Sequence, residues 1–327
     1  MQNKPSVLLT HKIPKIGIDL LKENFEVQVL DSDDSMDTQL KELLPSFDYL
    51  IPLLSVTIDG DLLRSCPNLK GIANYAVGYN NIDINAAIEC NIPISNTPDV
   101  LTNATADLTW GLILATTRRI VEGDQECRNS SFSGWAPEYL LGYEISGKIL
   151  GIVGMGRIGT AVAKRALGFD MKICYYSRSP SKYIPKSMNL ERIIDFNQFL
   201  DSCDIISLHV PYSEETHHLI GEDEFKLMKK ESFLINTSRG KVVDEAALIK
   251  ALKNGEITGA GLDVFYNEPS IPKELRKLSN TVLTPHIGSA TIFARNSMAI
   301  MVAENIIAIE NGLSPPNLIP EMKKERE

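Results

Sequence analysis

The chain lacks a surplus of positive charge, a long basic run and closely spaced cysteines. Its 327 residues carry 33 Lys and Arg against 42 Asp and Glu, a formal net charge of −9. Proteins bind nucleic-acid phosphates through clustered Lys and Arg, so we expect no nucleic-acid partner. The five cysteines are an odd, scattered set without a CxxC pair. This pattern argues against a disulfide framework and a structural zinc site, and it indicates reduced thiols.

Features of export and membrane insertion are also missing from the sequence. No apolar stretch approaches the ~18–20 residues that span a bilayer. The first residues, MQNKPSVLLTHKIP, lack the charged and then apolar regions of a signal peptide. No cluster of His, Cys and Asp has metal-ligand spacing, and there is no G-x-S-x-G elbow of a serine hydrolase. We therefore expect a cytoplasmic globular protein without a metal site or a membrane partner.

What the sequence does contain is a regular alternation of short apolar runs and helical stretches. At about 150 residues per domain, its length predicts two domains. Strand-like runs such as SVLLT (6–10) and DYLIPLL (48–54) alternate with helical stretches, as they do in βαβ units. A second alternating block runs from ILGIVG (149–154) to TVLTPH (281–286). The predicted fold class is α/β, with two Rossmann-like, doubly wound parallel sheets.

Two helical segments lie outside these alternating blocks. Residues 102–121 are predicted to form one long apolar helix, which must be buried between domains or against another subunit. A second helix is expected near residues 291–311. The segment after His286 is too short for a third domain, so it must pack on one of the first two.

A glycine loop is the strongest single motif. Gly154, Gly156 and Gly159 stand in G-x-G-x-x-G spacing after a strand-like run, and a helix and another strand-like run follow. That context makes the motif specific for a dinucleotide. The first glycine permits a tight turn, the second lets the backbone approach a pyrophosphate, and the third lets helix and strand pack closely. The anion would lie at the helix N-terminus, so Arg157 and Ile158 join the predicted cofactor-binding residues.

The end of the next strand bears on the choice between NAD and NADP. NAD-selective proteins place an Asp or Glu there, which accepts hydrogen bonds from the ribose 2′-hydroxyl and repels a 2′-phosphate. This chain has Ser177, Arg178 and Ser179 instead, with Lys182 close by. Arginine suits bidentate phosphate contact and the serines can donate hydrogen bonds, so the sequence favours NADP(H). NAD(H) remains the alternative, because a missing acid only removes discrimination.

Three polar residues follow strand-like runs downstream of the glycine loop: Arg239, Glu268 and His286. The carboxyl ends of parallel strands share one edge of a sheet, so one cleft could hold all three. Arg239 offers a fork of donors that matches a carboxylate, and His286 can exchange a proton near neutral pH. Glu268 would orient the imidazole and favour its protonated form. With a nicotinamide supplying or accepting the hydride, the implied reaction interconverts a 2-oxo acid and a 2-hydroxy acid.

Over nearly its whole length the chain resembles the D-isomer-specific 2-hydroxyacid dehydrogenase family. The resemblance rests on NYAVGYNNID (74–83), GKILGIVGMGRIG (147–159), DIISLHVPYSEETHHLI (204–220), LINTSRGKVVDEAAL (234–248), GAGLDVFYNEP (259–269) and TPHIGSAT (284–291). It implies that Arg239 binds and polarises the substrate, that Glu268 supports the histidine, and that His286 is the catalytic acid and base.

The same resemblance implies further site residues and an assembly. The backbone at Val77 and Gly78 would hold the substrate carboxylate, with the Leu54-Ser55 loop nearby. Positions that match cofactor-lining residues are Thr105, Val210, Pro211, Thr216, Thr237, Ser238, Asp263 and Gly288. A flavodoxin-like substrate domain of residues 1–99 and 288–327 would flank a Rossmann NAD(P)-binding domain of residues 100–287. A homodimer would form through the cofactor domains and bury the apolar helix over 102–121.

Within the family, residues 134–159 and the Ser-Arg-Ser strand end are most similar to glyoxylate/hydroxypyruvate reductases. The expected substrate is therefore a small 2-oxo acid. A D-lactate-type or 3-phosphoglycerate-type dehydrogenase is the alternative enzyme, although the loop LLSVTID (53–59) has no cation for a phosphorylated substrate. The alternative that is not an enzyme is a nicotinamide-sensing, corepressor-like binding protein. Slow turnover of every 2-oxo acid together with tight NADH binding would favour it.

Overall fold

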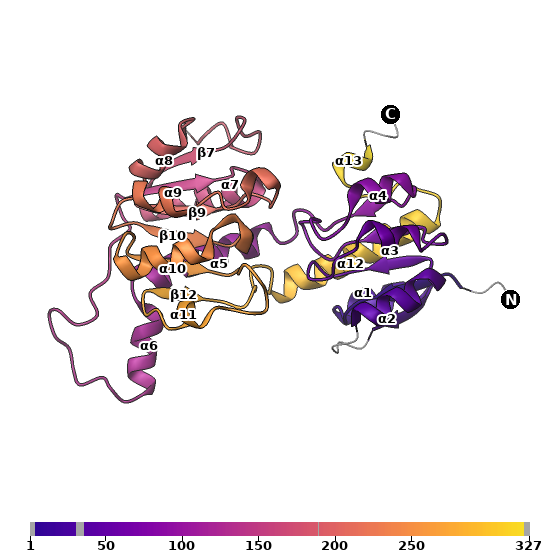
Figure 1. The fold of residues 1–327 in the computed structure, drawn as a ribbon, viewed down its shortest axis with the longest axis horizontal. Helices are drawn as coiled ribbons and strands as arrows, with labels where there is room; N and C mark the ends of the chain where they lie inside the picture. The colour runs from indigo at the N-terminus through magenta and orange to yellow at the C-terminus, as the bar shows by residue number, and fades with distance from the viewer. Residues whose placement is uncertain (1–3, 31–35, 189, 324–327) are drawn as a thin grey trace. The chain divides into compact units, whose positions relative to one another are not determined.

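The computed structural model describes residues 4–30, 36–188 and 190–323, and the chain divides into two compact units. The first unit comprises Met1–Leu101 and Ala290–Glu327, and the second comprises Thr102–Ser289. The chain enters the second unit after Leu101 and returns to the first after Ser289, in each case two residues later than the boundaries expected after residues 99 and 287. Both units are parallel sheets flanked by helices (Figure 1), so the predicted fold class is confirmed.

The sheet of the first unit has the strand order β2-β1-β3-β4-β5, which is the flavodoxin-like order. Its inner strands are buried on both faces, which explains why they read as unbroken apolar runs. The strands are β1 (Ser6–Leu9), β2 (Glu26–Val29), β3 (Tyr49–Ile51), β4 (Gly71–Ala73) and β5 (Ile94–Ser95). The helices are α1 (Lys15–Lys22), α2 (Met36–Leu43), α3 (Gly60–Arg64), α4 (Ile84–Glu89), α12 (Ile292–Glu310) and α13 (Pro320–Lys323).

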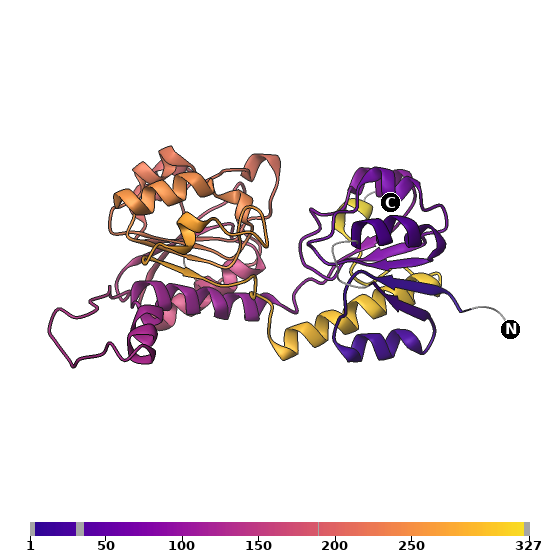
Figure 2. The same ribbon diagram turned by 60° about the horizontal axis from the view of Figure 1, so that its bottom comes forward.

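Helix α12 returns the end of the chain to the first unit and packs along α1 (Figure 2). The two helices are so close that a Cβ on Gly17 would lie 2.5 Å from the carbonyl oxygen of Ala299. At the other end of α12, Glu310 accepts a 2.7 Å hydrogen bond from the hydroxyl of Tyr49 on β3. The expectation that the C-terminal segment packs on an earlier domain is therefore confirmed.

Helix α12 also corrects one expectation. Among the described residues it is the one helix long and apolar enough to cross a membrane, with a mean hydropathy of 1.4. The expectation that no apolar stretch is long enough to span a bilayer is therefore wrong, as far as length and composition are concerned. Its buried apolar side chains pack on α1 and β4, as in the core helix of a globular domain, whereas Ile292 and Phe293 at its start are exposed.

The second unit has the strand order β12-β11-β10-β9-β6-β7-β8. Numbered along the chain, this is the Rossmann order 3-2-1-4-5-6 with a seventh strand added. The strands are β6 (Ile149–Val153), β7 (Lys172–Tyr176), β8 (Glu191–Arg192), β9 (Ile205–Leu208), β10 (Phe233–Asn236), β11 (Gly259–Leu262) and β12 (Thr281–Leu283). The helices are α5 (Thr102–Thr117), α6 (Ile120–Arg128), α7 (Arg157–Ala166), α8 (Phe196–Ser202), α9 (Glu222–Leu227), α10 (Glu245–Asn254) and α11 (Lys273–Arg276).

The prediction of a single helix over 102–121 is wrong. The segment forms two helices, because α5 ends at Thr117 and α6 begins at Ile120. The carbonyl of Thr117 accepts a 2.8 Å hydrogen bond from the amide of Tyr143 instead of continuing the helix. Arg119 then takes a left-handed conformation, with φ of 54°. Helix α5 packs on α7, β10 and β11 within its own unit, so its apolar residues need no second subunit to cover them.

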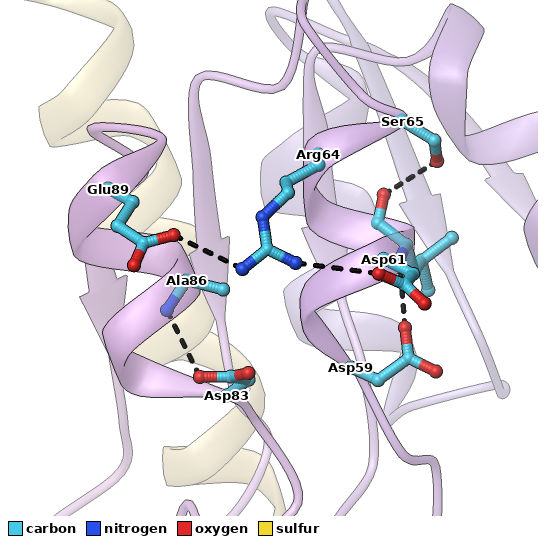
Figure 3. A network of polar contacts seen from close by, with 8 residues as sticks. Asp59, Asp61, Arg64, Ser65, Asp83, Ala86 and Glu89 are labelled. Carbon is cyan, nitrogen blue, oxygen red and sulfur yellow. Dashed lines mark hydrogen bonds and ion pairs between the residues drawn. The ribbon is translucent and has the colours of Figure 1, made fainter.

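In the first unit, α3 and α4 are fixed by a small polar network, shown in Figure 3. Asp59 caps α3 by accepting a 2.8 Å hydrogen bond from the amide of Leu62, and Asp83 caps α4 in the same way. Arg64 of α3 forms a 3.1 Å ion pair with Glu89 of α4. These caps set where the two helices begin, directly after the loops that contain the predicted substrate residues.

Replacing the cap on α4 tests this view of the first unit. Asp83→Ala should lower the free energy of unfolding by about 1 kcal/mol, because it leaves an amide at the helix N-terminus without its acceptor. Asp83→Asn keeps an equivalent acceptor and should change the value by only a few tenths of a kcal/mol. Urea unfolding followed by circular dichroism measures both. Equal losses in the two variants would mean that the charge, rather than the cap, is what stabilises α4.

Candidate functional site

The glycine loop forms a tight turn between β6 and α7, at the place where the strand order of the second sheet reverses. Gly154 has a backbone φ of +94°, a conformation that residues with a side chain rarely adopt. A Cβ on Gly159 would lie 2.3 Å from the carbonyl oxygen of Gly154, whereas a Cβ on Gly156 would meet no atom within 4 Å. The turn therefore packs tightly on its inner side and leaves open space on the outer side, where a ligand's phosphates could approach α7.

A cavity of about 950 Å³ opens beside this turn. This size suits a cofactor-sized ligand. Its lining comes from the residues that follow β6, β7 and β9, which the strand order places next to one another. The predicted cofactor residues in the lining are Gly154, Gly156, Ser177, Arg178, Ser179, Val210, Pro211 and Thr216. Arg157, Ile158 and Gly159 lie behind the turn as the first residues of α7.

His209 adds a polar group to the cavity wall. Its Nε2 lies 2.8 Å from the hydroxyl of Ser207, while its Nδ1 is buried without a partner among the described residues. Burial lowers the pKa of His209 to about 3, so the ring is neutral. A buried polar atom without a partner fits a site that receives a polar ligand group. The residues present are therefore compatible with a dinucleotide.

The turn after β7 is held more firmly than its sequence indicates. The Ser177 hydroxyl donates a 2.6 Å hydrogen bond to the carbonyl of Ser179, so its proton is engaged inside the turn. Arg178 pairs with Glu215 at 2.5 Å. Arg192 of the edge strand β8 donates to the carbonyls of Ser177 and Arg178 at 2.8 and 2.7 Å. Sequence reasoning missed Arg192 and Glu215, because both are distant in the chain from the turn they hold.

Glu268 and His286 form a direct hydrogen bond, with Oε2 and Nδ1 2.6 Å apart. The other carboxylate oxygen accepts a 3.0 Å hydrogen bond from the amide of Phe265. Partial burial works to raise the pKa of Glu268, but the hydrogen bond and charge of His286, with smaller contributions from Phe265 and Arg239, keep it below its ordinary value. The carboxylate is therefore charged, and it fixes the orientation of the imidazole.

The guanidinium of Arg239 is half-buried near this pair. Burial lowers the pKa of Arg239, and the negative charge of Glu268 opposes that shift. One Nη donates a 2.6 Å hydrogen bond to the carbonyl of Ser238. The next residue, Gly240, brings the two segments together, since a Cβ there would lie 1.9 Å from the carbonyl oxygen of Phe265. The second unit thus brings the three predicted catalytic residues together.

Asp263 anchors the segment that carries His286. Its buried carboxylate accepts hydrogen bonds from the hydroxyl of Thr284 at 2.7 Å and from the amides of Ile287 at 2.8 Å and Gly288 at 2.7 Å. Burial raises the pKa of Asp263 despite these bonds, which work to lower it. His286 has a φ of 51°, a conformation that non-glycine residues hold only where surrounding contacts support it. Asp263 provides such contacts on both sides of the histidine.

Asn236, at the end of β10, shapes the turn that precedes Arg239, and sequence reasoning missed it. Its side-chain oxygen accepts hydrogen bonds from the amide and the hydroxyl of Ser238 at 3.0 and 2.8 Å, and its NH₂ group donates to the Arg239 carbonyl at 2.9 Å. The hydroxyls of Thr237 and Thr109 lie 2.9 Å apart. The sequence did contain a signal for Asn236, because this residue begins the polar run that follows the apolar part of the strand.

The predicted substrate residues Val77 and Gly78 lie in the first unit, in a turn held by two asparagines. Asn96 donates a 2.7 Å hydrogen bond to the carbonyl of Val77, and Asn74 donates one of 2.8 Å to the carbonyl of Gly78. Both side chains therefore hold the turn by its carbonyls. Asn74 is fully buried, so the turn rests on the core of its unit.

The Leu54-Ser55 loop, also in the first unit, is held by a third asparagine, Asn81, which bonds to Asn74. Asn81 donates hydrogen bonds to the carbonyls of Leu53 and Val56 at 3.2 and 3.0 Å, and it exchanges hydrogen bonds with Asn74. The two predicted substrate segments are thus brought together in this unit. Within the described part of the chain, no group of three or more His, Cys, Asp or Glu side chains could hold a metal ion.

The chain is similar to known proteins over nearly all of its length. Residues 110–288 match the family model described as D-isomer specific 2-hydroxyacid dehydrogenase, NAD binding domain. A glyoxylate reductase of Thermococcus litoralis is 51% identical over 97% of this chain and 97% of its own length. A glyoxylate reductase of Pyrococcus horikoshii is 48% identical over 97% of this chain and 96% of its own.

Solved structures agree with these relatives. The TT0316 protein of Thermus thermophilus has a TM-score of 0.89 at 41% identity, over 96% of this chain and 99% of that one. An NADPH-dependent glyoxylate/hydroxypyruvate reductase of Sinorhizobium meliloti, in complex with NADP and malonate, has a TM-score of 0.88 at 31% identity, over 98% of each chain. The chain therefore belongs to the D-isomer-specific 2-hydroxyacid dehydrogenase family and is an oxidoreductase that uses a nicotinamide cofactor.

Proposed function

We propose that the protein reduces glyoxylate or hydroxypyruvate to the corresponding 2-hydroxy acid, of D configuration where that carbon is chiral, with NADPH preferred over NADH. The observation that carries this proposal is the 2.6 Å hydrogen bond between Glu268 and His286, in the same unit as the glycine turn and the half-buried guanidinium of Arg239. The relatives named glyoxylate reductase support this choice of substrate.

In this proposal each of the three residues has a separate task. Nδ1 of His286 is bonded to Glu268, so Nε2 is the ring atom that gives a proton to the substrate's 2-oxo oxygen. Arg239 binds the substrate carboxylate and polarises the neighbouring carbonyl. Glu268 orients the ring by accepting the hydrogen bond from Nδ1. The nicotinamide, when bound, supplies the hydride.

The remaining binding roles follow from the same proposal. Gly154, Gly156 and the start of α7 would hold the pyrophosphate, and the turn Ser177–Ser179 would hold the 2′-phosphate of NADP(H). Thr105, Thr237, Ser238, Asp263 and Gly288 would line the cofactor site, with Val210, Pro211 and Thr216 on the cavity wall. In the first unit, the backbone at Val77 and Gly78 and the Leu54-Ser55 loop would bind the substrate carboxylate. The asparagine bonds that fix these two segments support that role.

We also propose a homodimer formed through the second unit, in the cytoplasm. The basis for the dimer differs from the one expected, because α5 is covered within its own unit. Exposed apolar side chains gather instead on and after α6: Ile120, Val121, Phe132, Trp135 and Leu141. Such a group of exposed apolar residues is typical of an interface.

Initial rates test the reaction and the cofactor together. Oxidation of NADPH and of NADH would be followed at one pH with glyoxylate, hydroxypyruvate, pyruvate and 3-phosphohydroxypyruvate. We expect the highest kcat/KM with NADPH and either glyoxylate or hydroxypyruvate. Strict NADH use with pyruvate or the phosphorylated acid would overturn the substrate and cofactor assignments. Tight NADH binding with slow turnover of all four acids would indicate the binding-protein alternative.

A substitution at His286 tests the proton-transfer step. His286→Ala should lower the reductive kcat by roughly 10²–10⁴, because the variant lacks the group that donates the proton. Affinity for NADPH, measured by fluorescence quenching, serves as the control and should change little. A variant that keeps near-parental kcat would remove His286 from the mechanism.

A further inference from the structure

We propose that Glu215 restrains the preference for NADPH by competing with the cofactor's 2′-phosphate for the guanidinium of Arg178. This inference rests on the proposed cofactor cavity and deepens it by naming a residue that limits selectivity. Arg178 follows β7, and Glu215 lies in the short 3₁₀ turn Glu214–Thr216 after β9. Both residues line the cavity beside the glycine turn, and their side chains are 2.5 Å apart.

The backbone on the Arg178 side is held in place. Arg192 donates hydrogen bonds to the carbonyls of Ser177 and Arg178 at 2.8 and 2.7 Å. The Ser177 hydroxyl donates inside the same turn, to the carbonyl of Ser179. Its proton is therefore not available to a phosphate while that bond lasts. The guanidinium of Arg178 is left as the principal phosphate donor of this turn.

The backbone on the Glu215 side is also held. The hydroxyl of Thr216 donates a 2.8 Å hydrogen bond to the carbonyl of Pro211 and accepts one of the same length from the amide of Ser213. Because both backbones are fixed, the ion pair can open only by rotation of the two side chains. Glu215 therefore stays within reach of Arg178 whichever cofactor is bound.

Carboxylate and phosphate compete for the same donors. A guanidinium presents a flat fork of N–H groups that matches either anion, and two anions at one fork repel each other. A ribose 2′-hydroxyl is neutral and leaves the Arg178–Glu215 pair intact, whereas a 2′-phosphate must displace the carboxylate. The pair is exposed, with 82% and 69% of the two side chains accessible, so solvent weakens it and displacement is not prohibitive.

The test measures binding of the adenosine half of the cofactor, without its nicotinamide ring. Isothermal titration calorimetry compares ADP-ribose with 2′-phospho-ADP-ribose. Glu215→Gln should strengthen binding of the phosphorylated ligand about threefold to fivefold, because it removes the competing charge from Arg178. Binding of ADP-ribose should change less than about twofold, since the 2′-hydroxyl does not contend with the carboxylate.

Two further variants separate this competition from a general effect of charge. Glu214→Gln removes the same charge from the same cavity lining, but no ion pair joins Glu214 to Arg178 in the described structure. It should reproduce less than half of the gain. In an Arg178→Gln background, Glu215→Gln should give no selective gain. The gain in affinity from Glu215→Gln should also be smaller at high salt than at low salt, because salt screens an exposed ion pair.

Several results would overturn the inference. They are an equal effect of Glu215→Gln on both ligands, an equal gain from Glu214→Gln, and a gain that persists without Arg178. Since neither ligand undergoes hydride transfer, a failure to reduce glyoxylate would overturn the proposed substrate and leave this test intact. If the unsubstituted protein binds neither ligand, the inference and the proposed cofactor cavity are wrong together.

Discussion

The hydrogen bond between Glu268 and His286 is the contact on which the rest of the site depends. An imidazole can deliver a proton to one defined oxygen only if its ring is held in one orientation, and the Glu268 carboxylate provides that constraint. The carboxylate is itself held by the Phe265 amide and kept charged by its cationic neighbours. The fold brings the pair together because Glu268 and His286 follow β11 and β12, neighbouring parallel strands whose carboxyl ends share one edge of the sheet.

Around this contact, buried polar groups act as anchors rather than as reactants. Asp263 holds both sides of the segment that carries His286, and Asn236 shapes the turn before Arg239. Gly240 lets that turn lie directly against the peptide after Phe265. Each anchor is satisfied by several bonds, so the side chains proposed to be catalytic are positioned before any ligand arrives, which is how electrostatic preorganisation is built.

Much of the fold and part of the site could be predicted from the sequence. Strand–helix alternation is a local pattern, and it predicted both parallel sheets because strands buried on both faces must be apolar. The glycine spacing is also local and predicted the turn at Gly154. The break in the helix near Thr117 could not be predicted, because it depends on a hydrogen bond from Tyr143. The pairing of Arg178 with Glu215 was equally hidden, since the two residues meet only when β7 and β9 flank β6. Cys174 and Cys203, scattered in the chain, likewise lie 3.5 Å apart in the core.

The activity of a Glu268→Gln variant tests the central claim most directly. The pKa of Glu268 lies below its ordinary value, so its carboxylate is charged at neutral pH and can hold the imidazole through Nδ1. Glutamine has nearly the same shape but replaces the charged acceptor by a neutral amide, so the ring is held less firmly. At neutral pH the reductive kcat of the variant should fall at least about tenfold, while its affinity for NADPH should change little. A variant that keeps near-parental kcat would contradict the account and leave Glu268 with a purely structural role.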